Sequence, residues 1–401
     1  MKIGVVTSVY ALSETDRHAS FLVESTRHLV ARGHEVKVFA PSYEGCRSHS
    51  VQGVPVHRFR YFPRRWENLT HGEGAPNRIR NPLYLFVAAF YILFGLIGLL
   101  RFCRAERFDV LHVHWPFPHG IWGLAAARLF GIPMVLTFHG AELLLTRRFP
   151  FVAPVLRLIC RNADGIVCNS NFTAGQVRRY TSKPVNVIPF GATVMARAAD
   201  RDPAKPLKDI LYVGRLIERK GVDYLIDAMP LILRHLPTRL HIVGDGPMAE
   251  PWRARAANAD LSERVAFHGI VPNDRLEALY ASSDLFVLPA IVDDRGDTEG
   301  QGVVLVEAMS FAMPVVACEV GGIPDVVLSG ITGLLVPQRS PDELAKAIIA
   351  VLSDPALAAR FGAAGLAHAQ DYFSWDRITG LLEATYRNAV GTPSGAVRAT
   401  A

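Results

Sequence analysis

The sequence predicts an α/β protein built from two doubly wound domains, each with a largely parallel sheet. Short apolar runs recur along the chain, and each is followed by a stretch with helical character. The runs are continuous rather than alternating, as expected for strands buried on both faces of a parallel sheet. A polar, alanine-rich segment at 192–208 separates two such series. We therefore expect two Rossmann-like domains with a ligand cleft between them.

The predicted strands fall into these two series. The first comprises Ile3–Thr7, Val36–Ala40, Val110–His114, Met134–Phe138, Gly165–Asn169 and Val185–Pro189. The second comprises Ile210–Val213, Leu240–Val243, Val265–His268, Leu285–Leu288, Val315–Cys318 and Gly333–Val336. The predicted domains span 1–191 and 209–374, joined by a linker at 192–208. A closing helix at 375–390 fits either domain by pattern, and the small, polar tail at 391–401 is expected to be disordered.

Composition narrows the class of protein. With 401 residues, half of them hydrophobic, the chain has ample material for two cores. Its five cysteines are scattered and form no C-x-x-C pair, which favours a reducing cytosol over a disulfide framework or zinc site. No signal peptide is expected at the start. The net charge of +6 favours phosphate-bearing ligands or an anionic membrane. Nucleic acid is not an expected partner, because no zinc-finger or RNP pattern accompanies the charge.

The stretch Leu83–Leu100 has no charged residue. Its length is at the lower limit for a membrane span, which needs about 20 apolar residues, and predicted strands of one sheet lie on both sides of it. Arginines flank it, namely Arg58, Arg60, Arg64, Arg65, Arg78 and Arg80 before it and Arg101, Arg104 and Arg107 after it. We predict that the segment 58–107 faces an anionic membrane surface. An ordinary buried helix and a true span are the alternatives.

The run Asp297–Met309 carries the most specific pattern in the chain. Glu299 and Glu307 are separated by a Gly-x-Gly that lets the backbone approach a ligand closely. A helix is predicted to begin after Gly302, and a helix start binds anions. Glu307 then lies in this helix and can accept hydrogen bonds from adjacent hydroxyls such as those of a ribose. The alternative is a capping loop with a solvent-facing Glu307.

Two further runs place polar residues just past strand ends. Arg215 and Lys220 lie in Tyr212–Gly221, where a pair of cations can clamp a diphosphate and stabilise a leaving group without a metal. His139 lies at the carboxyl end of a strand, where parallel sheets bind ligands. Taken singly, each has a plainer interpretation, a solvated basic loop or a structural histidine.

Together these runs resemble the retaining GT-B glycosyltransferases of family 4 over nearly the whole chain. Further matching pieces are Val243–Pro247, Val320–Val327 and Phe373–Trp375, the last followed by the family's closing helix, which returns to the first domain. The resemblance implies transfer of a hexose-type sugar from a UDP- or GDP-linked donor to a glycan or lipid-linked acceptor. It implies retention of configuration, no metal and no other cofactor. With the predicted membrane surface, it places the protein in the cytoplasm, peripheral on the inner membrane face, in polysaccharide or glycolipid synthesis.

The resemblance also implies residue roles. Arg215 and Lys220 hold the pyrophosphate, Glu307 binds the ribose, and Glu299 contacts the donor sugar as a catalytic residue. His139 is the catalytic residue of the first domain. The remaining donor-binding positions are Gly300, Gln301, Gly302 and Val303 at the sugar, with Gly244 and Ile270 near the base.

The sequence departs from the family in two places. The loop Tyr10–Ser20 has no glycine, whereas many relatives carry a Gly-Gly pair there that touches the phosphates, so no phosphate contact is assigned to it. Gln301 stands where an aromatic or other apolar residue is frequent in relatives, which leaves the sugar open.

Other classes of protein remain as alternatives. A dehydrogenase is suggested by Gly244–Ala249, although a proline interrupts this fingerprint. A nucleotide-sugar epimerase and a non-catalytic membrane-associated nucleotide-sugar-binding protein would share the fold. A metal enzyme would need three ligands at a recognised spacing. The candidate ligands for it are His112, His114 and His119, Asp200 and Asp202, and Asp293, Asp294 and Asp297.

Overall fold

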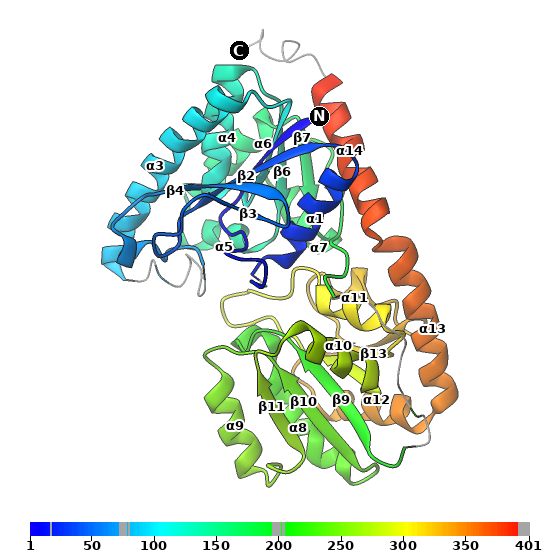
Figure 1. Cartoon of the computed structure of the whole chain (residues 1–401). Helices are drawn as coiled ribbons and strands as arrows, with labels where there is room; N and C mark the ends of the chain where they lie inside the picture. The colour runs from blue at the N-terminus through cyan, green and yellow to red at the C-terminus, as the bar shows by residue number, and fades with distance from the viewer. Residues whose placement is uncertain (17, 72–77, 79–80, 195–201, 203–204, 392–401) are drawn as a thin grey trace. The chain divides into compact units, whose positions relative to one another are not determined.

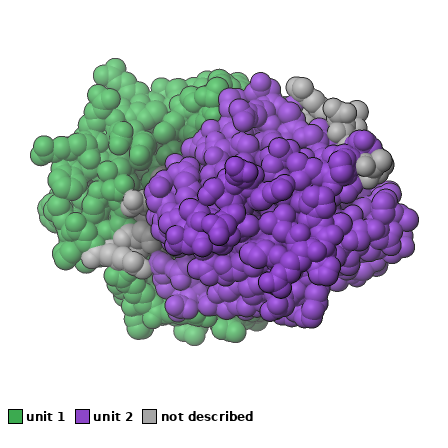
Figure 2. All heavy atoms as spheres, turned by 90° about the horizontal axis from the view of Figure 1, so that it is seen from below, with its two compact units in different colours: residues 1–190, 375–401 green, residues 191–374 purple. Residues whose placement is uncertain are grey.

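A computed structural model describes residues 1–16, 18–71, 78, 81–194, 202 and 205–391 (Figure 1). Arg80, Asp200 and most of the predicted tail lie outside these residues. The chain divides into two compact units, coloured separately in Figure 2. Unit 1 is Met1–Phe190 with Trp375–Ala401, and unit 2 is Gly191–Ser374. Each unit is an α/β layer structure around its own sheet, as the sequence predicts.

Unit 1 contains an eight-stranded sheet with the order β3-β4-β2-β1-β5-β6-β7-β8. All neighbouring strands are parallel except β3 and β4. The strands are β1 (Lys2–Val6), β2 (Glu35–Pro41), β3 (His49–Val51), β4 (Val54–Phe59), β5 (Val110–His114), β6 (Met134–Phe138), β7 (Gly165–Cys168) and β8 (Asn186–Val187). The strand order reverses between β1 and β5, and such a reversal is where a doubly wound sheet binds its ligand.

Strands β3 and β4 were not predicted. In β4, buried Val54 and Val56 alternate with exposed Pro55 and His57. Strand β3 forms the edge of the sheet and β4 lies next to it, and a search for continuous apolar runs does not detect an alternating strand.

Helices cover both faces of the unit 1 sheet. On one face α3 (Pro82–Glu106), α4 (Pro116–Phe130) and α6 (Val152–Asn162) pack side by side. On the other face α1 (Ser20–Ala31) packs against α14 (Trp375–Gly391). The short helices are η1 (Arg64–Trp66), α5 (Ala141–Arg148) and α7 (Asn171–Val177).

Helix α3 rests on this unit with one face only. A stripe of buried residues faces β2, β4 and α4, namely Tyr84, Val87, Tyr91, Gly95, Leu99, Phe102 and Cys103. A side chain at Gly95 would place its Cβ 2.2 Å from the Trp122 ring, so this glycine permits close packing. The opposite face is also apolar, and Leu85, Phe86 and Leu93 are 50%, 56% and 51% exposed. The alternative of an ordinary buried helix is therefore wrong for this face.

Unit 2 contains a six-stranded, fully parallel sheet with the order β11-β10-β9-β12-β13-β14. Its strands are β9 (Lys208–Val213), β10 (Thr238–Val243), β11 (Val265–Gly269), β12 (Leu285–Leu288), β13 (Val315–Cys318) and β14 (Gly333–Val336). Its helices are η2 (Glu218–Lys220), α8 (Val222–Leu233), α9 (Ala249–Asn258), α10 (Asn273–Ser282), α11 (Val303–Ser310), η3 (Ile323–Asp325), α12 (Pro341–Ser353) and α13 (Pro355–Tyr372). The strand order reverses between β9 and β12, so the loops after these two strands border the expected ligand edge.

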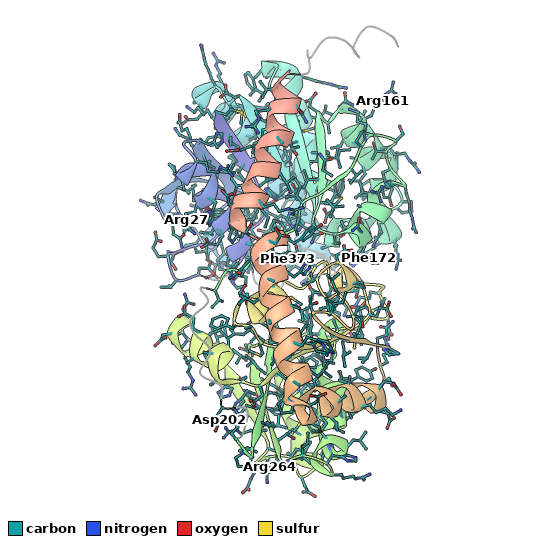
Figure 3. All side chains as sticks on the ribbon, turned by 90° about the vertical axis from the view of Figure 1, so that its right-hand side faces the viewer. Arg27, Arg161, Phe172, Asp202, Arg264 and Phe373 are labelled. Carbon is teal, nitrogen blue, oxygen red and sulfur yellow. The ribbon has the colours of Figure 1, made fainter. Side chains whose placement is uncertain are left out.

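The chain leaves unit 2 after α13. Phe373, labelled in Figure 3, is buried in the core of unit 2 and directly follows α13. Helix α14 begins two residues later and packs on α1, β5, β6 and β7 of unit 1. Its Tyr386 is fully buried there.

Candidate active site

Two glycines let the loops at the ligand edge of unit 2 approach one another. A Cβ at Gly244, which has a φ of 129°, would lie 2.0 Å from the carbonyl oxygen of Gly214. A Cβ at Gly221, with a φ of 61°, would lie 2.1 Å from the carbonyl oxygen of Pro289. Any other residue would push these backbones apart. The loops after β9, β10 and β12 are therefore held together at the edge where a ligand is expected.

A cluster of four charged side chains lies across the loops after β9 and β12. Lys220 Nζ donates a hydrogen bond to Glu299 Oε2, and Arg219 Nη1 donates to the same oxygen at 3.3 Å. Arg219 Nε also lies 3.3 Å from Asp297 Oδ2. The side chains of Lys220 and Glu299 are only 10% and 12% exposed. Two cations thus face two carboxylates, and the four charges balance locally.

Burial and ion pairing shift the pKa values of Glu299 and Lys220 in opposite directions. Burial alone would raise the pKa of Glu299, but the charges of Lys220 and Arg219 lower that pKa to about 2. Burial lowers the pKa of Lys220, and the Glu299 carboxylate opposes this shift. Glu299 is therefore ionised at neutral pH. An incoming diphosphate would compete with Glu299 for the two cations.

The backbone of Glu299 is fixed by the Gly-Gly pair that follows β13. Gly322 N–H donates to the Glu299 carbonyl at 2.9 Å. A Cβ at Gly321, with a φ of 57°, would lie 2.0 Å from that same oxygen. The run Val320–Val327 therefore positions Glu299 through a close backbone contact.

Glu307 is buried in α11, with 5% of its surface exposed. Its Oε1 accepts a hydrogen bond from Thr193 Oγ1 at 2.5 Å, and its Oε2 accepts one from Tyr280 Oη at 2.9 Å. The alternative of a solvent-facing Glu307 is wrong. Each carboxylate oxygen has a second lone pair, so the group can still accept from a ligand.

The remaining predicted donor-binding positions lie in the loops that follow β9, β10, β11 and β12 and at the start of α11. Gly302 has a φ of 87° and precedes α11, next to the buried Gln301 and the partly buried Gly300 and Val303. Arg215 is exposed in the loop after β9. In the loop after β11, Ile270 is 79% exposed, and the preceding Gly269 carbonyl accepts from Gly244 N–H at 2.8 Å.

His139 belongs to unit 1, where it directly follows β6. Its ring stacks on Trp115 and Phe190, with centroids 4.0 and 5.6 Å away. His139 Nε2 lies 3.1 Å from His114 Nδ1, and the backbone N–H of His139 donates a hydrogen bond to Glu142 Oε1 at 2.8 Å. Burial lowers the pKa of His139 to about 3 and raises that of Glu142 to about 7. The imidazole is therefore neutral at physiological pH and fixed in orientation.

Comparison with known proteins identifies the family. The glycosyl transferases group 1 family matches residues 198–368, and glycosyltransferase family 4 matches residues 19–194. A GDP-mannose-dependent alpha-(1-6)-phosphatidylinositol monomannoside mannosyltransferase from Mycolicibacterium smegmatis is 32% identical over 359 residues. That alignment covers 86% of this chain and 88% of the relative. The chain is a GT-B glycosyltransferase of family 4.

Other relatives and solved structures agree with this assignment. A D-inositol 3-phosphate glycosyltransferase from Segniliparus rotundus is 29% identical to the glycosyltransferase, over 73% of this chain and 70% of the relative. Sucrose-phosphate synthase from Thermosynechococcus elongatus has the same fold, with a TM-score of 0.78, 24% identity, and coverage of 96% of this chain and 98% of that one. HepE from Anabaena, solved with UDP and glucose, has a TM-score of 0.69 at 19% identity, over 96% of this chain and 99% of that one.

The dehydrogenase alternative is wrong for this glycosyltransferase. The glycines of Gly244–Ala249 serve loop packing, because a Cβ at Gly246 would lie 2.4 Å from the Leu216 carbonyl oxygen. The same run lies beside Gly214 of the β9 loop.

The histidines suggested as metal ligands in the glycosyltransferase have other partners. His112 forms hydrogen bonds through Nε2 with Thr137 Oγ1 at 2.6 Å and through Nδ1 with Tyr386 Oη at 2.7 Å. His119 bonds Tyr91 Oη and the Trp115 carbonyl, at 2.7 and 2.8 Å. Burial lowers the pKa of His112 to about 3 and that of His119 to about 4. Asp293 Oδ1 accepts from the backbone of Arg295 and Asp297, and so stabilises a turn.

Sequence reasoning missed several residues that contact the candidate site. Arg219 was passed over although it adjoins Lys220, and it pairs with a carboxylate 80 residues away. Thr193 stands in the segment predicted as a linker, yet it contacts Glu307. Tyr280 carried no signal, because a tyrosine in an amphipathic helix is usually core. Glu142 could have been noticed, since it lies three residues after His139.

Proposed function

We propose that this glycosyltransferase moves a hexose, with retention of configuration, from a GDP- or UDP-linked donor to a lipid-linked acceptor at the cytoplasmic membrane face. The single observation that carries the proposal is the buried cluster of Arg219, Lys220 and Glu299 at the strand-order reversal of unit 2. The mannosyltransferase named above supports a GDP-mannose donor and an inositol glycolipid acceptor as first candidates.

Each site residue has a proposed role in donor binding. Lys220 and Arg215 hold the pyrophosphate, and Arg219 is added to them because it shares the carboxylate that Lys220 binds. Glu307 accepts from the ribose hydroxyls with its remaining lone pairs. Gly300–Val303 and Glu299 border the sugar, while Gly244 and Ile270 border the base.

The proposed chemistry is a front-side displacement. The bond between the anomeric carbon and the diphosphate oxygen breaks, and the acceptor oxygen bonds to the same face of that carbon. The acceptor proton passes to the departing phosphate oxygen, so charge and atoms balance. Lys220 and Arg215 stabilise the negative charge that develops on the leaving group. The neutral His139 donates or accepts a hydrogen bond at the sugar.

The test of this proposal is a transfer assay with the full chain. GDP-mannose and UDP-glucose would be offered with and without phosphatidylinositol monomannoside, and the product linkage assigned by NMR. We expect transfer that requires the lipid acceptor and yields the donor's anomeric configuration. An inverted product would overturn retention. A converted sugar nucleotide formed without acceptor would instead identify an epimerase, and binding without turnover a non-catalytic protein.

The proposed membrane contact rests on the outer face of α3. This helix is long and apolar enough to cross a membrane, and only 28% of its most apolar 18-residue stretch is buried. The rings of Phe86, Phe90 and Phe94 follow one another along it, with centroids 4.9 and 6.0 Å apart. Exposed Arg101 and Arg104 lie in its last turns.

Not every flanking arginine belongs to this surface. Arg58 is buried and donates to the carbonyls of Tyr10, Ala11 and Pro41, so its inclusion was wrong. Arg60 pairs with the buried Glu67. We propose that α3 lies in the headgroup region of an anionic leaflet, with its apolar face toward the acyl chains.

Substitutions on α3 are expected to weaken vesicle binding. The double variant Phe86→Ser with Phe94→Ser should bind vesicles that contain anionic lipid at least about tenfold more weakly, because each buried aromatic ring contributes about 1.5–3 kcal/mol. Replacing Arg101 and Arg104 by glutamine should also weaken binding by at least about tenfold, because each contributes about 1 kcal/mol near such a surface. Vesicle co-sedimentation at several salt concentrations measures both effects.

The matched control is Ile331→Ser, which alters a residue of unit 2 that is 59% exposed. We expect this variant to bind vesicles like the wild type. Equal binding of the wild type to neutral and anionic vesicles would remove the electrostatic part of the proposal. Equal binding by the phenylalanine variant would remove α3 from it.

Replacing Glu307 should impair donor binding more than catalysis. In Glu307→Gln the hydrogen bonds to a charged acceptor are lost, and each contributes about 1.5–3 kcal/mol. KM for the donor should therefore rise about tenfold or more while kcat changes little, since the ribose is remote from the breaking bond. Steady-state kinetics measures this, with Glu343→Gln, whose side chain is 46% exposed in the first turn of α12, as the control. An unchanged KM with a collapsed kcat would contradict the ribose role.

A further inference from the structure

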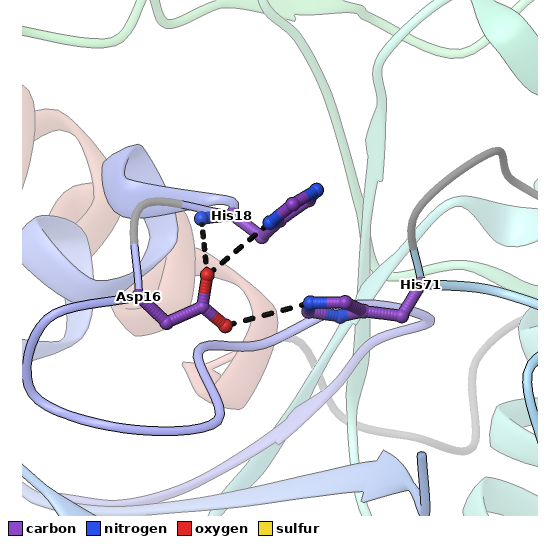
Figure 4. Close-up of side chains that lie close together, drawn as sticks. All are labelled: Asp16, His18 and His71. Carbon is purple, nitrogen blue, oxygen red and sulfur yellow. Dashed lines mark hydrogen bonds and ion pairs between the residues drawn. The ribbon is translucent and has the colours of Figure 1, made fainter. Parts of the chain in front are cut away.

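A carboxylate and two imidazoles come together in unit 1 (Figure 4). Asp16 and His18 belong to the loop between β1 and α1, and His71 belongs to the segment after η1. Asp16 Oδ1 lies 3.2 Å from His18 Nδ1, and Asp16 Oδ2 lies 3.4 Å from His71 Nε2. In the part of the chain that the structure describes, this is the one group of three such side chains with all ligand atoms within 4.8 Å of one another.

These separations suit a tetrahedral metal ion. Zn²⁺ binds imidazole nitrogen and carboxylate oxygen at about 2.0–2.2 Å, which puts neighbouring ligand atoms about 3.3 Å apart. Each histidine nitrogen already lies at about this separation from one oxygen of the Asp16 carboxylate, that of His18 from Oδ1 and that of His71 from Oδ2. The His18 side chain is 48% exposed, so its ring can rotate to close the remaining separation from His71.

The surroundings hold the carboxylate in place for a cation. Asp16 Oδ2 accepts from Leu12 N–H at 2.8 Å, and Oδ1 accepts from His18 N–H at 2.9 Å. Burial would raise the pKa of Asp16, but hydrogen bonds from the two histidines and these amides hold it well below its ordinary value. His71 is 7% exposed, and its ring lies 4.8 Å from that of Tyr43. Such outer contacts orient metal ligands in proteins.

The ligand chemistry selects the kind of ion. Two imidazoles with one carboxylate favour Zn²⁺ over Mg²⁺ or Ca²⁺, which prefer oxygen ligands. Arg58 donates to the Tyr10 and Ala11 carbonyls of the same loop, and its positive charge lowers the affinity of the cluster for a metal ion. With three ligands and one negative charge, the site should bind moderately and keep one coordination position for water.

We propose that Asp16, His18 and His71 form a Zn²⁺ site that ties the β1–α1 loop to the segment after η1. This loop has no glycine and borders the ligand edge of unit 1. The ion would order that loop, and none of the donor-binding roles proposed above involves it.

The experiment is a Zn²⁺ titration of the full chain produced without a histidine tag. Competition with a chromophoric chelator would give stoichiometry and affinity, and thermal melting would report the stabilisation that a folded-state ligand produces. We expect one Zn²⁺ per chain and a higher Tm.

Three variants locate the site. His18→Ala alters the most exposed ligand, so it should fold normally yet bind Zn²⁺ at least about tenfold more weakly. Asp16→Asn keeps the side-chain shape, removes the charge, and should weaken binding further. His49→Ala is the matched control, since His49 Nδ1 lies 3.9 Å from Cys46 Sγ and the two form a competing soft pair. We expect no change from it.

The outcomes separate the alternatives. Loss of binding in His49→Ala with retention in His18→Ala would move the metal to Cys46 and overturn the proposal. Absence of stoichiometric binding by the wild type at high micromolar Zn²⁺ would show that the cluster is only a set of ion pairs. Neither result bears on glycosyl transfer, which is measured separately.

Discussion

Lys220→Ala is expected to reduce kcat by about 10²-fold or more, since that is the usual effect of removing one group that stabilises developing charge. Lys220 donates to Glu299 in the resting protein and is nearly enclosed by the loops after β9 and β12. A diphosphate leaving group would take this ammonium from Glu299, so the lysine stabilises charge only as the donor binds and reacts. Steady-state kinetics on the full chain measures the loss.

Loss of stability must be separated from loss of catalysis in this variant. Removing one partner of a buried ion pair costs about 3–5 kcal/mol, although Arg219 still faces Glu299. Thermal melting should therefore accompany the kinetics, and Lys220→Arg should recover part of kcat because it keeps the charge. Lys346→Ala, at a side chain that is 71% exposed, is the matched control. A folded Lys220→Ala protein with wild-type kcat would contradict the proposed clamp.

The same clamp predicts transfer without a divalent metal at the phosphates. Activity should persist in excess chelator, because Lys220 and Arg215 supply the charge that Mg²⁺ or Mn²⁺ supplies elsewhere. Loss restored by either of these ions would contradict the prediction. Loss restored only by Zn²⁺ would point to the Asp16 loop instead.

Much of the fold was predictable because its signal is local. A strand buried on both faces, such as β5 or β12, is a short continuous apolar run, and for both the predicted bounds match the observed ones. Strand β3 is a three-residue edge strand, and the polar and apolar residues of the adjoining β4 alternate, so the same criterion misses both. The apolar character of α3 was equally visible, but which of its faces is covered depends on β2, β4 and α4.

The candidate site could be predicted from the sequence only where the residues adjacent in the chain determine a side chain's surroundings. The apolar residues around Glu307 indicate a buried carboxylate that needs partners, and it has two. The identity of these partners could not be predicted from the sequence, because Thr193 lies 114 residues from Glu307 in the chain. The pairing of Arg219 with Glu299 and of Asp16 with His71 likewise depends on loops brought together by the sheets. Long-range ion pairs leave no periodic trace in a sequence.

His139→Ala is expected to separate donor binding from transfer. His139 follows β6 in unit 1, whereas Arg215, Lys220, Glu299 and Glu307 all belong to unit 2. A nucleotide held by unit 2 should not depend on His139, so calorimetry should give nearly wild-type affinity for the nucleoside diphosphate. The cleft between the domains, and its closure on the donor, stay predictions that this variant tests.

Transfer by the variant should fall by about 10²-fold or more, the usual cost of misplacing a reacting group. Removing the ring also leaves a gap between Trp115 and Phe190, so His139→Gln is a second variant that keeps a hydrogen-bonding side chain. His57→Ala, at an exposed histidine of the same unit, is the control and should leave both measurements unchanged. Since the pKa of His139 is lowered to about 3, its loss should not remove any titration from the rate profile between pH 6 and 8. If His139→Ala abolished nucleotide binding while the fold stayed intact, the donor would depend on unit 1, and the assignment of donor binding to unit 2 alone would be wrong.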